Sequence, residues 1–183
     1  MGFVANDIHI SFDGITFLST GMYEDGDNKQ IAHGLKDGSP DAIDLAARKM
    51  ARMVSKDNVL VPIPSHHGDA RQTLELAKAI SKYSGVPVMD VLKGKERQSN
   101  YKAKHAGTPL TSEDMAMRKV GSISPWRRPL LIDNCSDSGE TAKAAVSALG
   151  VGNVLVYAIT DNLLKRSDRV FDLASKQSPS LHR

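Results

Sequence analysis

The sequence lacks several features that mark out particular classes of protein. A single cysteine, Cys135, among 183 residues excludes an intrachain disulfide and a zinc site built from several cysteines. No apolar run approaches the roughly 18 residues of a membrane-spanning helix. The N-terminus "MGFVANDIHISF" has neither the basic start of a signal peptide nor Ser or Thr at the sixth position for myristoylation. We therefore expect a cytoplasmic protein without a membrane anchor.

The net charge is small as well. Its formal value of +3 is too low to indicate nucleic acid as a direct ligand. Basic residues are nevertheless concentrated in "KGKERQSNYKAKHAG", residues 93–107, where Glu96 is the single acidic residue. Arg97, Lys102 and Lys104 in this segment belong either to a solvated charged loop or to a flap that closes over an anionic ligand.

What the sequence does contain is a regular alternation of strand and helix patterns. Residues 7–19 alternate around an Asp-Gly pair and predict a hairpin. Ser39 followed by Pro40 predicts the start of a helix. The alternation predicts an α/β fold with a mainly parallel central sheet flanked by helices, in one domain over residues 1–183. Strands are expected at 58–64, 86–93, 129–133 and 151–162, and helices at 40–55, 70–85 and 139–150.

Two polar clusters follow strands of this pattern. "SHHGD" begins at Ser65, and "DNCSDSGET" covers residues 133–141. Ligands of such sheets bind beyond the carboxyl ends of the strands. Adjacent His66 and His67 have no further ligands at zinc spacing, so they form either an ordinary polar turn or a phosphate contact. Because they are neighbours at a strand end, their side chains are expected to point in different directions.

Residues 133–141 have the composition of a phosphate site. The start of the following helix presents free backbone N–H groups, and Ser136, Ser138 and Thr141 add hydroxyl donors. Gly139 would let the backbone approach a phosphate, so a bulky residue there should abolish phosphate binding and leave the fold intact. The Walker and dinucleotide-binding glycine patterns are absent. The alternative is that these residues only cap the helix.

Asp133 at the strand's end does not suit phosphate itself, because its charge would repel that ligand. A carboxylate beside a phosphate cradle suits sugar hydroxyls or a magnesium ion, so the combination indicates a phosphorylated sugar. Cys135 has no base paired with it by any sequence motif, and we expect a small buried residue rather than a nucleophile. Trp126 is expected to pack or to form an interface.

The segment "PLLIDNCSDSGET" resembles the phosphoribosyl pyrophosphate (PRPP) loop of type I phosphoribosyltransferases. In that family, apolar residues lead into acidic residues and then into a cradle for the 5′-phosphate. The resemblance implies that Asp133 and Asp137 are catalytic, with Asp137 assisting proton transfer near the base. It also implies PRPP and phosphate contacts from the other residues of the loop: Asn134, Cys135, Ser136, Ser138, Gly139, Glu140 and Thr141.

The resemblance covers roughly residues 31–161 and is most evident to the competence-associated, ComF-like branch, through Lys36 and "PIPSHH". It implies the type I phosphoribosyltransferase fold, PRPP bound with Mg²⁺ to which Asp133 contributes indirectly, and a homodimer as a common assembly. The implied regions are a hood or hairpin at 1–40, a core at 41–165, a frayed tail at 175–183, a pyrophosphate loop at Ser65, His66 and His67, and a flexible loop with Arg97, Lys102 and Lys104.

The sequence departs from the family pattern at several positions. Asn134 replaces the second acidic residue, Cys135 and Ser136 replace an aliphatic pair, and "DARQT" stands where "RGFNQ" is expected. We expect a glycosyltransferase of nucleotide metabolism that transfers phosphoribose between pyrophosphate and a nitrogenous base or amine. The alternative is a non-catalytic protein that binds PRPP or a nucleotide in regulation or DNA uptake. A third possibility, an α/β hydrolase using Asp133, lacks the "DxD" pattern.

Overall fold

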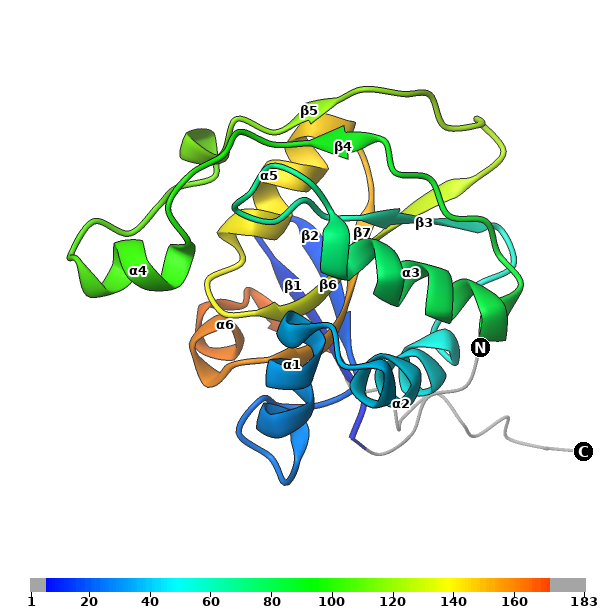
Figure 1. Ribbon diagram of the computed structural model, residues 1–183, viewed down its shortest axis with the longest axis horizontal. Coiled ribbons are helices and arrows are strands. Elements are labelled where there is room, and N and C mark those ends of the chain that lie inside the picture. Colours follow the sequence, from blue (N-terminus) through cyan, green and yellow to red (C-terminus); the bar gives the residue numbers. More distant parts are fainter. Residues whose placement is uncertain (1–5, 172–183) are drawn as a thin grey trace, which may run out of the picture.

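The computed structural model describes residues 6–171, which form an α/β fold around one six-stranded sheet (Figure 1). The strand order is β3-β6-β7-β2-β1-β8. The first four strands of this order are parallel, whereas β1 is antiparallel to both β2 and β8. The expected mainly parallel sheet is therefore confirmed, and its last two strands make it mixed. The strands are β1 (Ile8–Phe12), β2 (Ile15–Ser19), β3 (Asn58–Pro62), β6 (Arg128–Ser136), β7 (Asn153–Ile159) and β8 (Arg169–Val170).

Helices cover both faces of the sheet. On one face α1, α2 and α3 contact one another, β6 and β7, and on the other face α5 packs on β6 and on a separate two-stranded sheet of β4 and β5. The helices are α1 (Asn28–Asp37), α2 (Pro40–Ala51), α3 (Arg71–Ser84), α4 (Asn100–His105), α5 (Glu140–Leu149) and α6 (Asp161–Arg166). The small sheet pairs β4 (Leu92–Lys93) with β5 (Arg118–Lys119), and a 3-10 turn, η1 (Glu113–Met115), lies between them in sequence.

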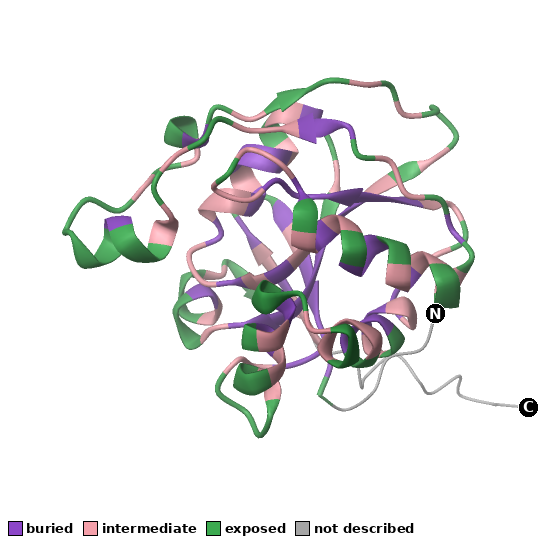
Figure 2. Ribbon diagram, in the orientation of Figure 1, coloured by how far each residue is buried: buried purple, intermediate pink, exposed green. Residues whose placement is uncertain are grey.

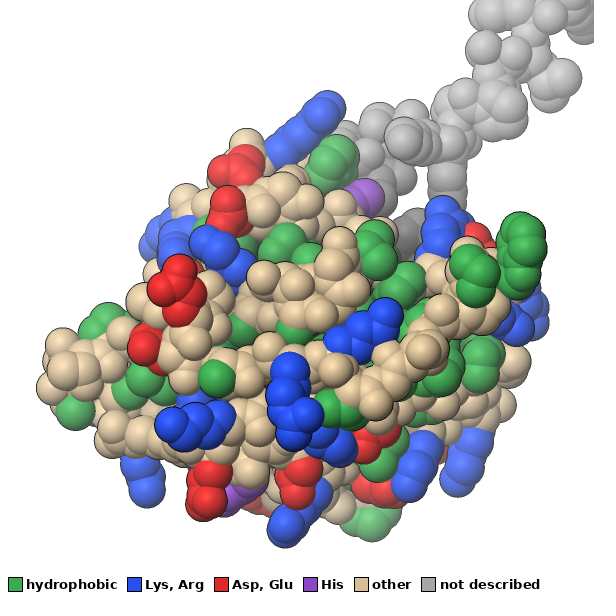
Figure 3. Space-filling view, turned by 90° about the horizontal axis from the view of Figure 1, so that it is seen from above, with side chains coloured by type: hydrophobic (Ala, Val, Ile, Leu, Met, Phe, Trp, Pro, Cys, Tyr) green, Lys and Arg blue, Asp and Glu red, His purple; other side chains and the backbone are tan. Residues whose placement is uncertain are grey.

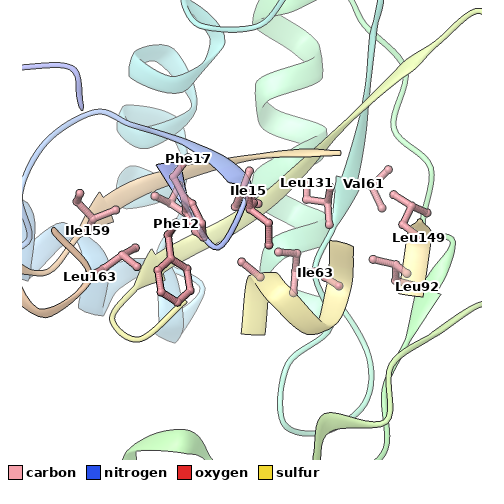
Figure 4. Packing of buried hydrophobic residues seen from close by; sticks show 14 of the residues in the cluster. Phe12, Ile15, Phe17, Val61, Ile63, Leu92, Leu131, Leu149, Ile159 and Leu163 are labelled. Atoms are coloured by element: carbon pink, nitrogen blue, oxygen red, sulfur yellow. The ribbon is translucent and has the colours of Figure 1, made fainter. Parts of the chain in front are cut away.

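The central strands are buried on both faces (Figure 2). Successive strand residues point to opposite faces, so Ile132 packs with apolar residues of α2 and α3, whereas Leu131 packs with apolar residues of α5. Figure 4 shows this second cluster, where Leu131 and Val61 lie near Leu149. Burial on both faces explains why these strands are continuous apolar runs rather than alternating ones.

The expected hairpin forms, but it does not lie in a separate hood. Phe12 pairs with Ile15 across a two-residue turn in which Asp13 and Gly14 have φ angles of 50° and 73°. A turn of this type needs positive φ at both positions, which Asp-Gly tolerates. β2 then pairs in parallel with β7 and extends the central sheet. Among residues 6–40, the start of β1, the loop after β2 and the helix α1 lie near the carboxyl ends of the parallel strands.

The expected helix starts and ends are largely confirmed. Ser39 caps α2, since its Oγ accepts a hydrogen bond from the Ala42 N–H at 3.5 Å, and Pro40 is the first residue of the helix. Gly85 ends α3 in the left-handed conformation with a φ angle of 73°. α2 stops at Ala51, four residues before the expected end at 55.

Several expected strand boundaries were wrong. The strand expected at 151–162 is shorter, since β7 ends at Ile159 and Asp161 already begins α6, and the strand expected at 58–64 ends at Pro62. Residues 86–93 contribute one isolated bridge, between Val88 and Leu60, and then the short strand β4 in the second sheet. Pro87 has no N–H to donate to a ladder, which explains why no regular strand forms there. β6 is longer than expected, because Cys135 and Ser136 still pair with β7. Much of the polar cluster 133–141 is therefore strand rather than loop.

No helix within residues 6–171 combines the length and apolar character needed to cross a membrane. The tail expected to fray at 175–183 lies outside the described residues.

Candidate functional site

The polar clusters meet at one edge of the sheet. Because β3, β6, β7 and β2 are parallel, their carboxyl ends lie at the same edge. The turn 63–70, the loop 137–139 and the loop 20–27 leave the sheet there. In Figure 1 this edge faces α1, α4 and α6. The sequence-based expectation that both polar clusters lie at strand ends of one sheet is confirmed.

Asp133 lies in β6 close to this edge and is partly buried. Its Oδ1 accepts a hydrogen bond from the Asn134 N–H at 2.8 Å. Burial raises the pKa of the Asp133 carboxyl to about 6, although the Asn134 N–H and the positive charges of Lys36 and Arg97 act to lower it. Lys36, at the end of α1, and Arg97 of the flexible loop therefore both lie within electrostatic range of this carboxylate.

The residues after Asp133 are enclosed by the fold. Asn134 and Ser136 are 8% and 6% exposed, and successive strand residues face opposite sides of the sheet. The Asn134 side-chain oxygen is buried without a hydrogen-bond partner among the described residues. Such an unpaired acceptor costs about 1–3 kcal/mol. Burial raises the pKa of the Cys135 thiol to about 12, so Cys135 is a protonated thiol at neutral pH, in line with a packing role.

Asp137 is the most highly connected residue of the loop between β6 and α5. Its Oδ1 accepts hydrogen bonds from Thr160 Oγ1 at 2.7 Å and from Asn162 Nδ2 at 3.3 Å, and its Oδ2 lies 3.1 Å from Lys104 Nζ. Burial raises the pKa of Asp137, but the hydrogen bonds and the Lys104 charge outweigh it and hold this pKa below its ordinary value. Asp137 is therefore an ionised carboxylate at neutral pH.

Gly139 shapes this loop by packing as well as by conformation. Its φ angle of 81° lies in the left-handed region, and a Cβ there would stand 2.6 Å from the Phe12 ring and 3.2 Å from Leu163. The expectation that a bulky residue at 139 leaves the fold intact is therefore wrong, because the added atoms would enter the core. Gly139 is required for the hairpin and α6 to pack against the loop.

Arg166 of α6 braces the same loop. Its guanidinium donates to the Ser138 carbonyl at 2.6 Å and lies 3.3 Å from Glu140 Oε1. It also lies over the Phe12 ring, 4.9 Å from its centroid. Arg166 was not found by sequence analysis. It lies 28 residues from Ser138 in sequence, and no local motif marks it.

The turn after β3 is closed by its own backbone. The Ser65 N–H donates to the Asp69 carbonyl at 2.7 Å, and the Gly68 N–H donates to the Ser65 carbonyl at 3.1 Å. The rings of His66 and His67 lie against each other with centroids 4.0 Å apart, so the expectation that they point in different directions was wrong. Burial and the nearby charges of His67, Arg97 and Lys102 lower the pKa of His66.

The basic segment is bonded to this turn. The Gly94 N–H donates to the Gly68 carbonyl at 3.0 Å, and the Arg97 N–H donates to the His66 carbonyl at 2.9 Å. The Arg97 guanidinium donates to the Ser65 carbonyl at 3.1 Å. A side chain at Gly68 would place its Cβ 2.8 Å from the Gly94 carbonyl oxygen. Residues 94–112, called the flap below, therefore begin as a backbone extension of the turn.

The flap also crosses to the loop between β6 and α5. Asn100 Nδ2 donates to Thr141 Oγ1 at 2.9 Å, and the Ser112 N–H donates to Glu140 Oε2 at 3.1 Å. The Lys104–Asp137 pair is the third connection. The flap therefore spans both polar clusters, while most of its charged side chains remain exposed to solvent.

The residues at this edge do not form a metal site by themselves. No group of three or more His, Cys, Asp or Glu side chains within residues 6–171 has the spacing to hold a metal ion. Asp133 is one carboxylate among the positive charges of Lys36 and Arg97. Mg²⁺ in proteins is usually held by one or two carboxylates together with substrate phosphates. The residues thus fit a metal that arrives with an anionic substrate.

A separate hollow lies away from these residues. It is a cavity of about 690 Å³ at the opposite edge of the sheet, where the parallel strands begin. The first residues of these strands line it: Ile15, Asn58, Arg128 and Asn153. This cavity lacks the converging titratable groups that are found at the edge formed by the carboxyl ends of the strands, called the carboxyl edge below. Trp126 near the cavity is 86% exposed, so its side chain is not packed into the part of the chain that the structure describes. Figure 3 shows apolar side chains scattered between Lys and Arg on the face seen from above.

The carboxyl edge is therefore the candidate site, because an ionised carboxylate, a raised-pKa carboxyl and a basic flap converge there. Comparisons with known proteins add no assignment: the chain matches no protein-family model and no curated protein.

Proposed function

We propose that the chain is a PRPP-binding phosphoribosyltransferase with the type I fold, which transfers phosphoribose between pyrophosphate and a nitrogenous base or amine. The observation that supports it best is the joint attachment of the flap. It is bonded to the turn at Ser65–His66 and to the loop at Asp137–Thr141, the positions that the resemblance assigns to pyrophosphate and to the 5′-phosphate.

The 5′-phosphate would bind at the start of α5. The first-turn N–H groups of a helix have no acceptors within the helix, and the helix dipole favours an anion there. Ser138 and Thr141 add hydroxyls, and Lys104 adds a positive charge. Asn100 and Lys104 contact this loop, so a bound phosphate would replace some of these flap contacts with its own.

The ribose hydroxyls would be met by β6. Asp133 offers a carboxylate acceptor, and its raised pKa shows that it lacks sufficient compensating donors in the protein alone. The unpaired Asn134 side-chain oxygen is a second acceptor, although the side chain must become accessible to reach a hydroxyl. A hydroxyl donor from the sugar would satisfy either group.

Pyrophosphate would lie on the turn after β3. Arg97 and Lys102 are close enough to His66 to lower its pKa, and these three side chains would contact the leaving group, on which negative charge develops. Mg²⁺, bound through the substrate's own oxygens with Asp133 acting indirectly, would neutralise part of that charge. Closure of the flap over the turn would exclude water.

The transfer itself is a substitution at C1′ of the ribose. The nitrogen lone pair of the acceptor forms the new C–N bond as the bond from C1′ to pyrophosphate breaks, and the electron pair leaves on the pyrophosphate oxygen. The proton lost by the acceptor nitrogen passes to a base. The resemblance assigns this role to Asp137, whose carboxylate is ionised at neutral pH and can accept the proton.

The second candidate function is binding without turnover. Asn134 favours it, because an amide at this position brings no negative charge to stabilise a cationic ribose in the transition state. The same pocket would then sense PRPP or a nucleotide, in regulation or DNA uptake.

Titration calorimetry with PRPP and Mg²⁺, followed by an assay of pyrophosphate release with a panel of nucleobases and amines, separates these functions. The transferase predicts binding and release with at least one acceptor. Binding with no release for any acceptor would leave the non-catalytic function. Absence of PRPP binding would overturn both. Asp137→Asn should abolish release, whereas Asp41→Asn, at an exposed position on α2, should not.

A further inference from the structure

The loop after β2, residues 20–27, borders the same edge on the side of β7. The Tyr23 N–H donates to the Ile159 carbonyl at 2.7 Å, and the Ile159 N–H donates to the Gly21 carbonyl at 3.2 Å. Residue 160 follows directly, and Thr160 Oγ1 donates to Asp137. Tyr23 is thus held beside the strand end that supports the Asp137 carboxylate.

The loop is anchored to the core. The buried Tyr157 donates its hydroxyl to Asn28 Oδ1 at 2.8 Å, and Asn28 Nδ2 donates to the Met22 carbonyl at 2.8 Å. The Tyr23 hydroxyl is hydrogen-bonded to His33 Nε2 of α1 at 3.1 Å. These bonds hold the loop at both ends, so Tyr23 and the residue after it occupy defined positions at the edge.

The loop and the flap carry opposite charges. Residues 20–27 contain Glu24, Asp25 and Asp27 and no basic residue, and none of these carboxylates forms a salt bridge with another described residue. Glu24 lies within electrostatic range of Cys135 and Tyr23. The flap contributes Arg97, Lys102 and Lys104. The flap is therefore basic and the loop 20–27 acidic. Two further lysines lie near them: Lys36 of α1 within electrostatic range of Asp133, and Lys165 of α6, which pairs with Asp161, within range of Glu24.

If the proposed function is right, this distribution of charge determines the sides on which PRPP and the acceptor bind. Pyrophosphate leaves toward the basic side, and the acceptor must approach C1′ from the other face of the ribose. That side is bordered by Tyr23 and Glu24. A carboxylated acceptor would meet the like charge of Glu24, which weakens its binding. A neutral or cationic nitrogen compound can donate N–H hydrogen bonds to the same carboxylate.

We propose that Tyr23 and Glu24 bind the acceptor, and that the acceptor is a neutral base or a cationic amine rather than a carboxylated base. The partly buried ring of Tyr23 offers an apolar face for a planar base, and Glu24 selects against negative charge. This inference rests on the proposed transferase function and names the substrate class of its site.

The test compares adenine, uracil and ammonium with orotate as acceptors, with PRPP and Mg²⁺ present, by pyrophosphate release. The wild-type protein should use at least one of the first three with kcat/KM about tenfold or more above that for orotate. Glu24→Lys should move this ratio toward orotate by about tenfold. Asp41→Lys, which makes the same change of charge on the exposed surface of α2, should leave the ratio unchanged.

The role of Tyr23 is tested by measuring the acceptor KM and the PRPP affinity separately. Tyr23→Ala should raise the acceptor KM and leave PRPP affinity unchanged, and Tyr23→Phe should restore the KM. If PRPP binds without release, acceptor binding to the PRPP complex replaces the rate as the readout, with the same expected order.

Preference for orotate in the wild-type protein, an unchanged ratio in Glu24→Lys, or no acceptor binding in the PRPP complex would overturn the inference and leave PRPP binding standing. Failure of the wild-type protein to bind PRPP would overturn the proposed function, and the inference with it.

Discussion

Lys104 of α4 lies 3.1 Å from the Asp137 carboxylate and joins the flap to the loop between β6 and α5. Both side chains are about half exposed, so the pair contributes little to stability, on the order of 0–1 kcal/mol. Its effect is local. It holds the basic flap against the loop that is proposed to bind phosphate, and it leaves Asp137 ionised.

Lys104→Ala should loosen the flap without unfolding the protein. The melting temperature should stay within about 2 °C of the wild-type value, because an exposed pair is lost. Limited digestion with trypsin should cut the flap at Lys95, Arg97 or Lys102 faster, since opening no longer breaks the ion pair. Lys78→Ala, which removes an exposed pair with Glu75 on α3, is the matched control. Equal digestion rates for both variants would show that the pair does not hold the flap.

Gly139→Ala should destabilise the fold by more than its backbone conformation explains. An alanine at positive φ costs about 1 kcal/mol, and overpacking adds about 1–3 kcal/mol because the Cβ stands 2.6 Å from the Phe12 ring. Gly150 has a similar φ of 86° with nothing within 4 Å of a Cβ, so Gly150→Ala measures the conformational cost alone. Urea denaturation of both variants gives the difference. Equal losses would show that the loop moves away from Phe12 at no cost.

Local patterns predicted the parts of the fold that local chemistry determines. The apolar run of β3, the Ser39 cap of α2 and the Gly85 end of α3 each depend on residues within one turn or one strand. The position at which β6 ends does not depend on nearby residues alone. The polar residues after Asp133 predicted a loop, but backbone pairing with β7 continues to Ser136. A strand ladder is formed by backbone N–H and C=O groups and does not require apolar side chains.

The candidate site was predicted in its components but not in its connections. The residues that fix Asp137 and Ser138, namely Thr160, Asn162 and Arg166, come from the next strand end and helix, 23 to 28 residues away. No spacing rule relates them to the loop. The close contact between the His66 and His67 rings depends on the closed turn to which the flap is hydrogen-bonded, which is a tertiary arrangement.

Cys135 should be unreactive in the folded protein. Its pKa of about 12, raised mainly by burial, leaves almost no thiolate at pH 8. The reaction with a disulfide reagent should be at least about a hundredfold slower than for the protein unfolded in urea, where the thiol has its ordinary pKa. Rapid labelling of the native protein would contradict the burial of this residue and favour a nucleophilic role.

Asp133 should make the protein less stable as the pH rises from about 4 to about 6. The folded-state pKa of about 6 lies above the ordinary value of 3.8, so in this range the folded protein binds more protons than the unfolded chain, and its stability falls with pH. Below pH 4 the carboxyl is protonated in both states, and above pH 6 it is ionised in both.

Asp133→Asn should therefore abolish this slope and stabilise the protein at pH 7, by about 1–2 kcal/mol after allowance for solvent screening of a partly exposed group. The same variant should lose PRPP affinity if the proposed function is right, because the group proposed to accept hydrogen bonds from the ribose hydroxyls has lost its charge. Denaturation at pH 4, 5, 6 and 7 measures the slope, with Asp41→Asn as the control. A gain in stability together with a loss of binding would identify Asp133 as a residue retained for the ligand at the expense of the fold. A loss of stability at pH 7 would show that its interactions with Lys36 and Arg97 outweigh its burial.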